Sequence, residues 1–324
     1  MANFFTSLFS SRASATDAPA ADQSTKNNLK HFDILKYDGV RAQKIGQVDY
    51  AIRCYKEALL LNEDAETLNY LVNVYVQKGM IDEAEEITAR LVALDPTEVD
   101  ALLLAANLRF MQEAYGDVIK QTAHILTLEP TNYLAQVVQA KAHKKKNDML
   151  SALLGFTQTI ALQPDFMQAY LLRAEVLHAM NQNNEALEDI EKILVDNSED
   201  ENAYLLRAEI HEVLGNMEQA AADYRQTLML NPFNEYAMIL LGQLFIKQND
   251  LDAAILHFTD VIETNGAVAE AYNERGRAYF LQGNKKAAAE DMKTAIELNP
   301  EGETAKRFEG ENKNFEDMYK GGIF

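Results

Sequence analysis

Proline recurs in this chain at multiples of one interval. The separations between five of its six prolines are 34, 34, 68 and 68 residues, for Pro96, Pro130, Pro164, Pro232 and Pro300. Ser198 and Gly266, which are also turn-forming residue types, occupy the two places that the interval leaves without proline. A fixed period of this length is the signature of stacked repeats, so the sequence predicts an extended array rather than a single compact domain.

Each interval contains two segments with the spacing of an amphipathic helix. In the repeat that ends at Gly266, apolar residues follow a helical pattern over 236–245 and again over 253–258, and Gln248-Asn-Asp250 separates the two segments. Proline ends the second helix, because it lacks an N–H and clashes with the preceding turn. The chain has only 14 glycines and 6 prolines, which also favours helices. We therefore expect two antiparallel helices in every repeat, called A and B below.

Numbering each repeat so that its proline is position 32 aligns residues of similar size. The small residue at position 8 is Ala106, Ala140, Ala174, Ala208, Gly242 and Gly276, and the alanine at position 20 is Ala84, Ala152, Ala186, Ala220, Ala254 and Ala288. Aromatic residues occur at position 11, as Tyr75, Phe245 and Tyr279, and at position 24, as Phe156, Tyr224 and Phe258. The third repeat departs from this pattern, with Arg109 at position 11 and Val118 at position 20. Small residues let two helices approach, and large ones fill the space beside them. The period and this pattern resemble the tetratricopeptide repeat family. The resemblance implies an all-α fold, a right-handed α-solenoid of antiparallel helix pairs.

The repeat pattern divides the chain into three segments. Residues 29–300 are expected to form eight repeats, and the first repeat is displaced by one residue. Residues 1–28 are expected to form a flexible N-terminal segment, because 12–27 are rich in Ala, Ser, Thr and Asp. Residues 301–324 no longer follow the repeat and alternate in charge. We expect them to form a C-terminal capping helix and tail that cover the last hydrophobic face.

Composition favours a binding protein over an enzyme or a nucleic-acid-binding protein. The formal charge of −20 opposes phosphate binding, and the chain has no P-loop, zincin or nucleophile-elbow motif. Its one cysteine, Cys54, suits a reducing compartment. No apolar run approaches the roughly 20 residues of a membrane span. We therefore predict a cytoplasmic, bacterial, non-enzymatic adaptor that binds a protein or peptide, with no cofactor, metal, nucleic acid or small-molecule substrate.

The N-terminal residues suggest an alternative role as a structural tether. Phe4, Phe5, Leu8 and Phe9 could together dock the solenoid on a membrane or on a larger complex. The segment is short and only Arg12 lies nearby, so docking on a protein is favoured over attachment to a membrane.

The resemblance also implies a binding groove, because the A helices of tetratricopeptide arrays line a concave surface with positions 2, 5, 6, 9, 12 and 13. In this chain the predicted groove residues are Asn69, Tyr70, Asn73, Leu103, Asn107, Phe110, Val138, Lys141, Lys144, Leu171, Glu175, Leu205 and Tyr236. Positions 5 and 6 are mostly aliphatic. Such a stripe has two interpretations: an open apolar groove, or side chains packed between successive A helices.

Basic residues gather at one place in this acidic chain, the end of helix A in the fourth repeat. The cluster, Lys141 and Lys144–Lys146, has two interpretations. The lysines complement the helix dipole and pair with acids such as Glu175, or they anchor an acidic partner. The carboxylate-binding set of chaperone-binding family members is not reproduced here. Only Lys36 matches one of its five residues.

Arginine at position 7 and aspartate at position 23 occur together. Three repeats have both residues, as Arg173 with Asp189, Arg207 with Asp223 and Arg275 with Asp291. Repeats without the arginine lack an acid at position 23. Because the two positions lie on the facing helices of one repeat, we expect each arginine to pair with its aspartate and hold helix A to helix B.

Overall fold

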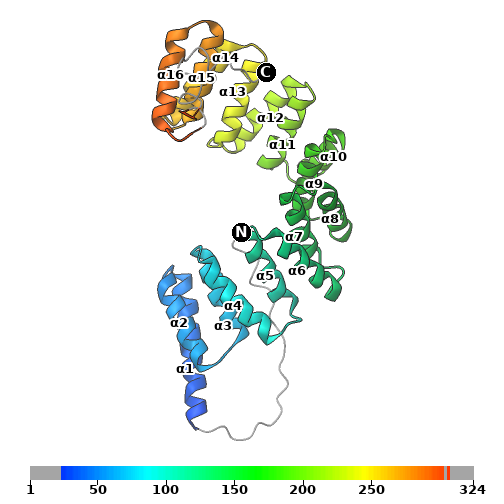
Figure 1. Cartoon of the computed structure of the whole chain (residues 1–324), viewed down its shortest axis with the longest axis vertical. Coiled ribbons are helices and arrows are strands. Elements are labelled where there is room, and N and C mark those ends of the chain that lie inside the picture. The colour runs from blue at the N-terminus through cyan, green and yellow to red at the C-terminus, as the bar shows by residue number, and fades with distance from the viewer. Residues whose placement is uncertain (1–22, 303–304, 307–324) are drawn as a thin grey trace. The chain divides into compact units, whose positions relative to one another are not determined.

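A computed structural model describes residues 23–302 and 305–306. These residues divide into two units, 1–138 and 139–324, whose boundary falls within one helix, and each unit is described by itself. The described part of the chain contains sixteen helices and no strand, and consecutive helices form antiparallel pairs (Figure 1). The predicted all-α solenoid fold is confirmed.

Six helices and the first part of a seventh form the first unit: α1 Gln23–Lys44, α2 Val48–Leu61, α3 Ala65–Gln77, α4 Ile81–Leu94, α5 Val99–Met111, α6 Tyr115–Leu128 and α7 Tyr133–Lys145. The end of α7 belongs to the second unit, with α8 Met149–Leu162, α9 Met167–Ala179, α10 Asn183–Asp196, α11 Glu201–Val213, α12 Met217–Leu230, α13 Glu235–Lys247, α14 Leu251–Thr264, α15 Ala269–Gln282 and α16 Lys285–Leu298. Odd-numbered helices are the A helices of the repeats, and even-numbered ones are the B helices.

The two ends of the repeat array differ in how far the structure describes them. Helix α1 begins at Gln23, six residues before the start expected at Leu29, although Phe32 is its first buried residue. The segment with Phe4, Phe5, Leu8 and Phe9 lies outside the described residues, as does most of the predicted capping helix over 301–324. Both expectations remain predictions.

A left-handed residue connects helix A to helix B in every repeat. Position 15 has a φ between 59° and 90° in all eight repeats, at Gly46, Gly79, Glu113, Asn147, Asn181, Gly215, Asn249 and Gly283. Glycine and asparagine adopt this conformation at little cost. The residue type at this position therefore explains where the A helix ends in seven repeats, with Glu113 as the exception.

Aspartate side chains cap several helices. Asp148 and Asp250 cap the B helices α8 and α14, and Asp200 caps the A helix α11, because each side chain accepts a hydrogen bond from the backbone N–H three residues later.

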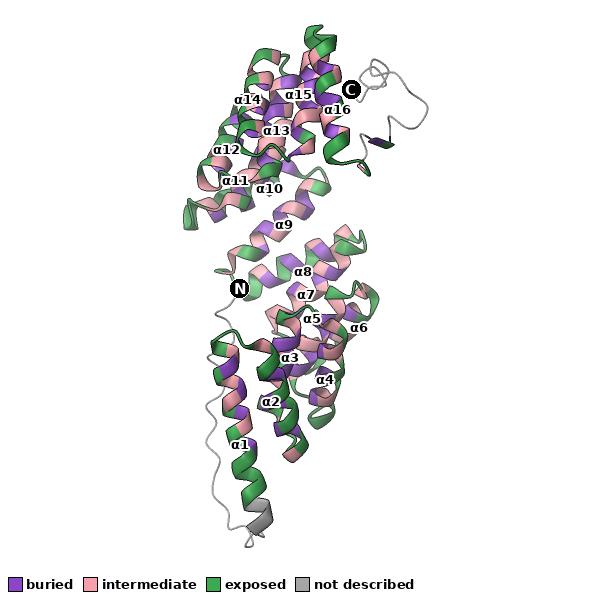
Figure 2. Ribbon diagram, turned by 90° about the vertical axis from the view of Figure 1, so that its left-hand side faces the viewer, coloured by how far each residue is buried: buried purple, intermediate pink, exposed green. Residues whose placement is uncertain are grey.

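The buried residues lie along the faces that neighbouring helices share within each unit, and the outer turns are exposed (Figure 2). Position 8 on helix A meets position 24 on helix B. The aromatic residues at position 24 in three repeats, Phe156, Tyr224 and Phe258, are fully buried. A Cβ placed on Gly242 would lie 2.2 Å from Cζ of Phe258, so the ring occupies the space that the glycine leaves.

The predicted Arg–Asp pairs are confirmed in all three repeats. Each guanidinium donates two hydrogen bonds to one carboxylate, and in the Arg207–Asp223 pair both donor–acceptor distances are 2.8 Å. The other two pairs have distances of 2.6–2.8 Å. The aspartates are only 4–7% exposed, and hydrogen bonding to Asp223 raises the pKa of Arg207. We call these pairs the Arg–Asp bridges.

Each bridging arginine also contacts groups that the sequence pattern did not indicate. Its guanidinium lies over a tyrosine three residues earlier, 5.2 Å from the ring centre for Arg207 and Tyr204. Its outer nitrogen reaches position 25 on helix B of the preceding repeat, where Arg275 donates to Thr259 at 3.1 Å. An Arg–Asp bridge therefore joins three helices from two successive repeats.

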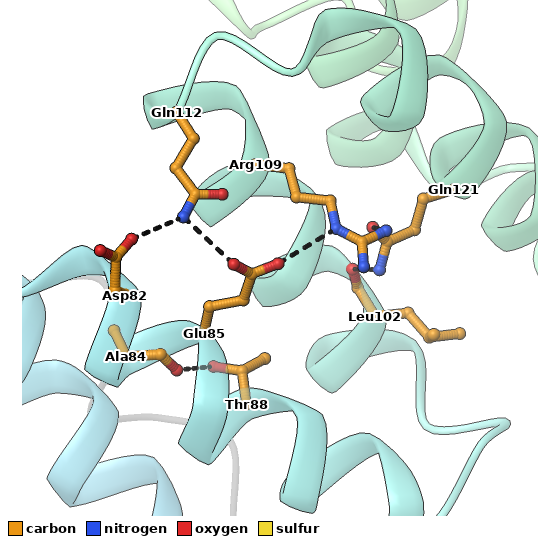
Figure 3. A network of polar contacts seen from close by, with 8 residues as sticks. All are labelled: Asp82, Ala84, Glu85, Thr88, Leu102, Arg109, Gln112 and Gln121. Atoms are coloured by element: carbon orange, nitrogen blue, oxygen red, sulfur yellow. Dashed lines mark hydrogen bonds and ion pairs between the residues drawn. The ribbon is translucent and has the colours of Figure 1, made fainter.

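Two of the repeats without the arginine use another donor at position 23. In the third repeat Gln121 donates to the backbone carbonyl of Leu102 at 3.0 Å and accepts from Arg109 at 3.2 Å (Figure 3). In the seventh repeat His257 donates to the backbone carbonyl of Met238 at 2.8 Å. Both acceptors are at position 4 of helix A. These bonds link helix A to helix B where no bridge exists.

Candidate peptide-binding surface

The A helices divide their residues between a buried face and a partly exposed face. On α9, Ala174 and Leu177 at positions 8 and 11 are buried, whereas Glu175 and His178 at positions 9 and 12 are partly exposed. A step of 100° per residue keeps positions 2, 9 and 12 on one side of the helix in each repeat. A continuous surface therefore needs similar residues at these positions in successive A helices.

In the first unit, the predicted residues of α3 are half-buried and partly engaged with their neighbours. The Tyr70 ring stacks on Tyr55 with 5.7 Å between ring centres, and its hydroxyl donates to Glu66 at 2.6 Å. Burial, together with this hydrogen bond, raises the pKa of Tyr70 to about 12. Asn69 and Asn73 lie on the same helix and are also half-buried.

Four further predicted residues lie on α5 and α7 in the first unit. Leu103 packs against the core that contains Leu102 and Ile125. Asn107 is exposed and donates to the backbone carbonyl of Leu103, and the half-buried Phe110 makes an edge contact with Tyr115. Val138 is half-buried. Packing within the unit therefore accounts for much of the burial of Leu103 and Phe110.

In the second unit, the aliphatic residues at positions 5 and 6 are buried or half-buried, so they form a floor rather than an exposed apolar stripe. Leu171 is 9% exposed and Leu206 is 8% exposed, and both belong to one core cluster with Ile190 and Ile210. Leu205 is half-buried against the next cluster, around Tyr224. For Leu171, this burial favours packing between successive A helices over an open apolar groove.

Polar residues stand beside this floor on four successive A helices of the second unit. We call them the polar row: Lys141 and Lys144 on α7, Glu175 and His178 on α9, Glu209 and Glu212 on α11, and Tyr236 and Lys247 on α13. Several members are paired across neighbouring helices. Lys144 pairs with Glu175, and Lys247 pairs with Glu212. Tyr236 forms a hydrogen bond with Glu209. The structure therefore brings the predicted residues Lys144 and Glu175 together.

Burial shifts the protonation of two members of the polar row. It lowers the pKa of Lys141 and raises that of Glu209, because removal from water disfavours the charged form of each group. Tyr236 opposes the shift at Glu209 through its hydrogen bond. Tyr224 donates to Glu212 at 3.0 Å, which fixes this carboxylate from the core side.

Four members of the polar row are not among the predicted groove residues. They are Glu209 at position 9, His178 and Glu212 at position 12, and Lys247 at position 13. The identity of position 12 varies among Phe110, Lys144, His178 and Glu212, so no single residue type marked it. The position of each residue within the repeat was the signal that could have identified them.

Lys36 has partners that explain why it does not serve as part of a carboxylate-binding site. Its side chain is only 10% exposed, and its ammonium lies 2.9 Å from Asp64 and 2.5 Å from Glu66. Within residues 23–302 and 305–306, no group of three metal-ligating residues could hold a metal ion. The same residues include no helix that is long and apolar enough to cross a membrane.

Comparison with known families identifies the repeat. The tetratricopeptide repeat model matches residues 179–235 and 239–303, which include Glu209 and Glu212 of α11 and Lys247 of α13. This match and the fold support a tetratricopeptide repeat protein. A comparison with curated protein sequences finds no match. The family supports a role as a protein-interaction scaffold, which agrees with the role predicted from composition.

Solved structures with the same fold include other tetratricopeptide proteins. A tetratricopeptide repeat protein from Parabacteroides merdae matches with a TM-score of 0.61 and 18% identity, over 79% of this chain and 98% of that one. PilW, a type IV pilus biogenesis factor, matches with a TM-score of 0.58 and 19% identity, over 64% and 97%. Cut9–Hcn1 of the APC/C matches with a TM-score of 0.58 and 12% identity, over 84% of this chain and 52% of that one. These similarities describe the fold.

The buried Glu274 on α15 gives a pH-dependent prediction. Burial raises its pKa, so the folded chain binds this proton more readily than the unfolded chain does. Its contribution is therefore unfavourable above the folded pKa, and the cost disappears as the pH falls below the unfolded value of about 4.5. We expect Glu274→Gln to raise Tm at pH 7 by a few degrees, at about 2–4 °C for each kcal/mol. Melting curves from pH 7 to pH 4 should show this gain shrinking. A gain independent of pH would contradict the assignment.

Proposed function

We propose that the second unit binds an extended segment of a protein partner along the polar row. The observation that carries the proposal is the repetition of partly exposed polar residues at positions 9 and 12 of α7, α9 and α11, beside a floor that includes the buried Leu171 and Leu206. Tyr236 and Lys247 of α13 extend this row through their contacts with Glu209 and Glu212. A row of polar groups on rigid helices can recognise several consecutive residues of a peptide.

The charges of the polar row indicate the character of the peptide. Lysines lie at both ends, on α7 and α13, and glutamates lie between them on α9 and α11. Because Lys144 and Lys247 are already paired with acids, a ligand must exchange these pairs for its own. We therefore expect a segment of mixed charge rather than a uniformly acidic one. This chemistry favours specificity more than high affinity.

We propose, as the sequence predicts, that the protein binds its partner without catalysis and is cytoplasmic. Its bacterial origin is likewise a prediction. The family of the repeats and the single buried cysteine support this proposal. The alternative, a tether that docks through Phe4, Phe5, Leu8 and Phe9, concerns residues outside the described structure.

Site-specific photo-cross-linking tests the proposed surface. A benzoylphenylalanine at Tyr236, which is 57% exposed on α13, should form a discrete cross-linked species with a partner in extracts of the native cell. The matched control is Leu256, which is 65% exposed on the B helix α14 and should give at least about tenfold less of that species. Adding Glu175→Lys to the Tyr236 variant should reduce its cross-linking. Equal yields at Tyr236 and Leu256 would contradict binding along the polar row.

A further inference from the structure

A pocket of about 350 Å³ opens between α2 and α4 in the first unit. Its floor is apolar and consists of Leu59 on α2, Leu71 and Tyr75 on α3, and Ile87 on α4, all at most 9% exposed. Charged residues surround the opening, and Leu60 beside it is 85% exposed. A volume of this size lies within the range of small ligand-binding pockets, roughly 300–1,000 Å³.

The pocket occupies the place that an Arg–Asp bridge fills in other repeats. Leu71 is at position 7 and Ile87 is at position 23, three periods of 34 residues before Arg173 and Asp189. Lys56 is at position 25, which the bridging arginine of the next repeat reaches elsewhere. With two aliphatic residues in place of the ion pair, position 7 has no side chain long enough to cross from α3 to both α2 and α4. The hollow is therefore a consequence of the missing bridge.

The pocket lies on a different side of α3 from the predicted groove. Leu71 and Tyr75 face the pocket, whereas Asn69 and Asn73 are each two residues away from one of them. Two residues correspond to a rotation of about 200° around a helix, so the asparagines lie on the opposite face. The pocket is also in the first unit and shares no residue with the polar row. It is a separate surface.

The opening of the pocket carries acidic groups that lack ion-pair partners. Arg90 is paired with Glu63 at 3.1 Å. The Lys56 ammonium lies 5.6 Å from the centre of the Tyr75 ring. Neither Glu83 nor Glu86 forms an ion pair in the described part of the chain, although both attract Lys56 from a longer distance. Because Glu63 neutralises Arg90, the other charged groups at the opening are one lysine, Lys56, and two glutamates, Glu83 and Glu86.

We infer that this pocket is a second binding site, which takes an aliphatic side chain flanked by basic residues from a protein partner. The aliphatic side chain packs against the accessible parts of Leu59, Leu60 and Ile87, above the fully buried Leu71. It leaves water there without stranding a polar group. The basic residues beside it reach Glu83 and Glu86. The exposed Leu60 covers the inserted side chain. The chain's formal charge of −20 attracts a basic partner over a longer range.

Methyl NMR spectroscopy of the full chain with synthetic tripeptides tests the inference. We expect acetylated and amidated Arg-Leu-Arg to shift the methyl signals of Leu60, Leu71 and Ile87 and to saturate on the order of millimolar concentration. Glu-Leu-Glu and Arg-Gly-Arg should bind at least about tenfold more weakly. The first lacks the basic residues, and the second lacks the aliphatic side chain. The absence of saturable shifts at these methyls, or equal shifts with all three peptides, would overturn the proposal.

Rebuilding the bridge provides a matched control variant. The double substitution Leu71→Arg and Ile87→Asp introduces the pair found at Arg173 and Asp189, and it should close the pocket and abolish peptide shifts at Leu59 and Leu60. Circular dichroism confirms that this variant folds. If it does not fold, Glu83→Lys with Glu86→Lys leaves the floor intact and should reverse the preference between Arg-Leu-Arg and Glu-Leu-Glu. Unchanged binding in either folded variant would overturn the proposal, whatever cross-linking at Tyr236 shows.

Discussion

Arg207→Ala should lower the free energy of unfolding by about 3 kcal/mol. The substitution leaves Asp223, which is 6% exposed, without the guanidinium that donates two hydrogen bonds to it. A buried carboxylate that loses its partner retains its desolvation cost, and this cost dominates the loss. The contact between Arg207 and the ring of Tyr204 is removed as well. Chemical denaturation of the purified chain measures the change.

A double-mutant cycle separates the bridge from other effects of Arg207. Asp223→Ala should also destabilise, and the double variant should lose much less than the sum of the two single losses, because either substitution removes the same interaction. Arg41→Ala is the matched control, since Arg41 is 72% exposed in its pair with Asp38 and should change stability by at most about 1 kcal/mol. Additive losses for Arg207 and Asp223 would show that the two side chains are energetically independent.

Phe258→Ala should cost about 3–5 kcal/mol, the usual range for removing a buried aromatic side chain. The ring is fully buried between α13 and α14, and Gly242 leaves the space that it fills. Removal of the ring leaves a cavity beside the glycine that the rigid helices cannot close. Thermal and denaturant unfolding measure the loss, and Leu256→Ala on the exposed side of α14 is the control.

The contact between Gly242 and Phe258 predicts a coupling of known sign. In the natural chain Gly242→Ala should destabilise by about 1–3 kcal/mol, because the new Cβ would lie 2.2 Å from the ring. In the Phe258→Ala background the same substitution should be close to neutral or stabilising, since the methyl group enters the cavity. A constant cost of Gly242→Ala in both backgrounds would mean that the ring does not occupy this space.

The helix pairs and the Arg–Asp bridges were predictable because repetition supplies several examples of one position within a single chain. The proline interval located the B-helix ends, and the joint occurrence of Arg207 with Asp223 in register identified the bridge. The contact of the arginine with position 25 of the preceding repeat was not predictable. Position 25 is threonine at Thr157 and Thr259 but glutamate at Glu191, so no single residue type marks the contact in all three repeats.

The sequence predicted repeat positions for the candidate site, but not whether the side chains at those positions are exposed or buried. Leucines at positions 5 and 6 are consistent with a groove or with a core, and only burial distinguishes them. Leu171 belongs to a core cluster, whereas the neighbouring Glu175 is partly exposed. The pocket between α2 and α4 was missed for another reason. Leu71 and Ile87 are ordinary core residues in isolation, and the hollow becomes evident only when the volume around them is known.

The distribution of Arg–Asp bridges has a consequence for how the repeats open. In a linear array each repeat is stabilised by itself and by its immediate neighbours, so local unfolding follows the strength of individual junctions. Arg173, Arg207 and Arg275 each connect a repeat with the preceding one in the second unit. The junction between the first two repeats has a hollow in the same place. The repeats joined by Arg173 and Arg207 therefore form a cooperative segment, while the first two repeats depend on their shared apolar core and on ion pairs such as Lys36–Asp64.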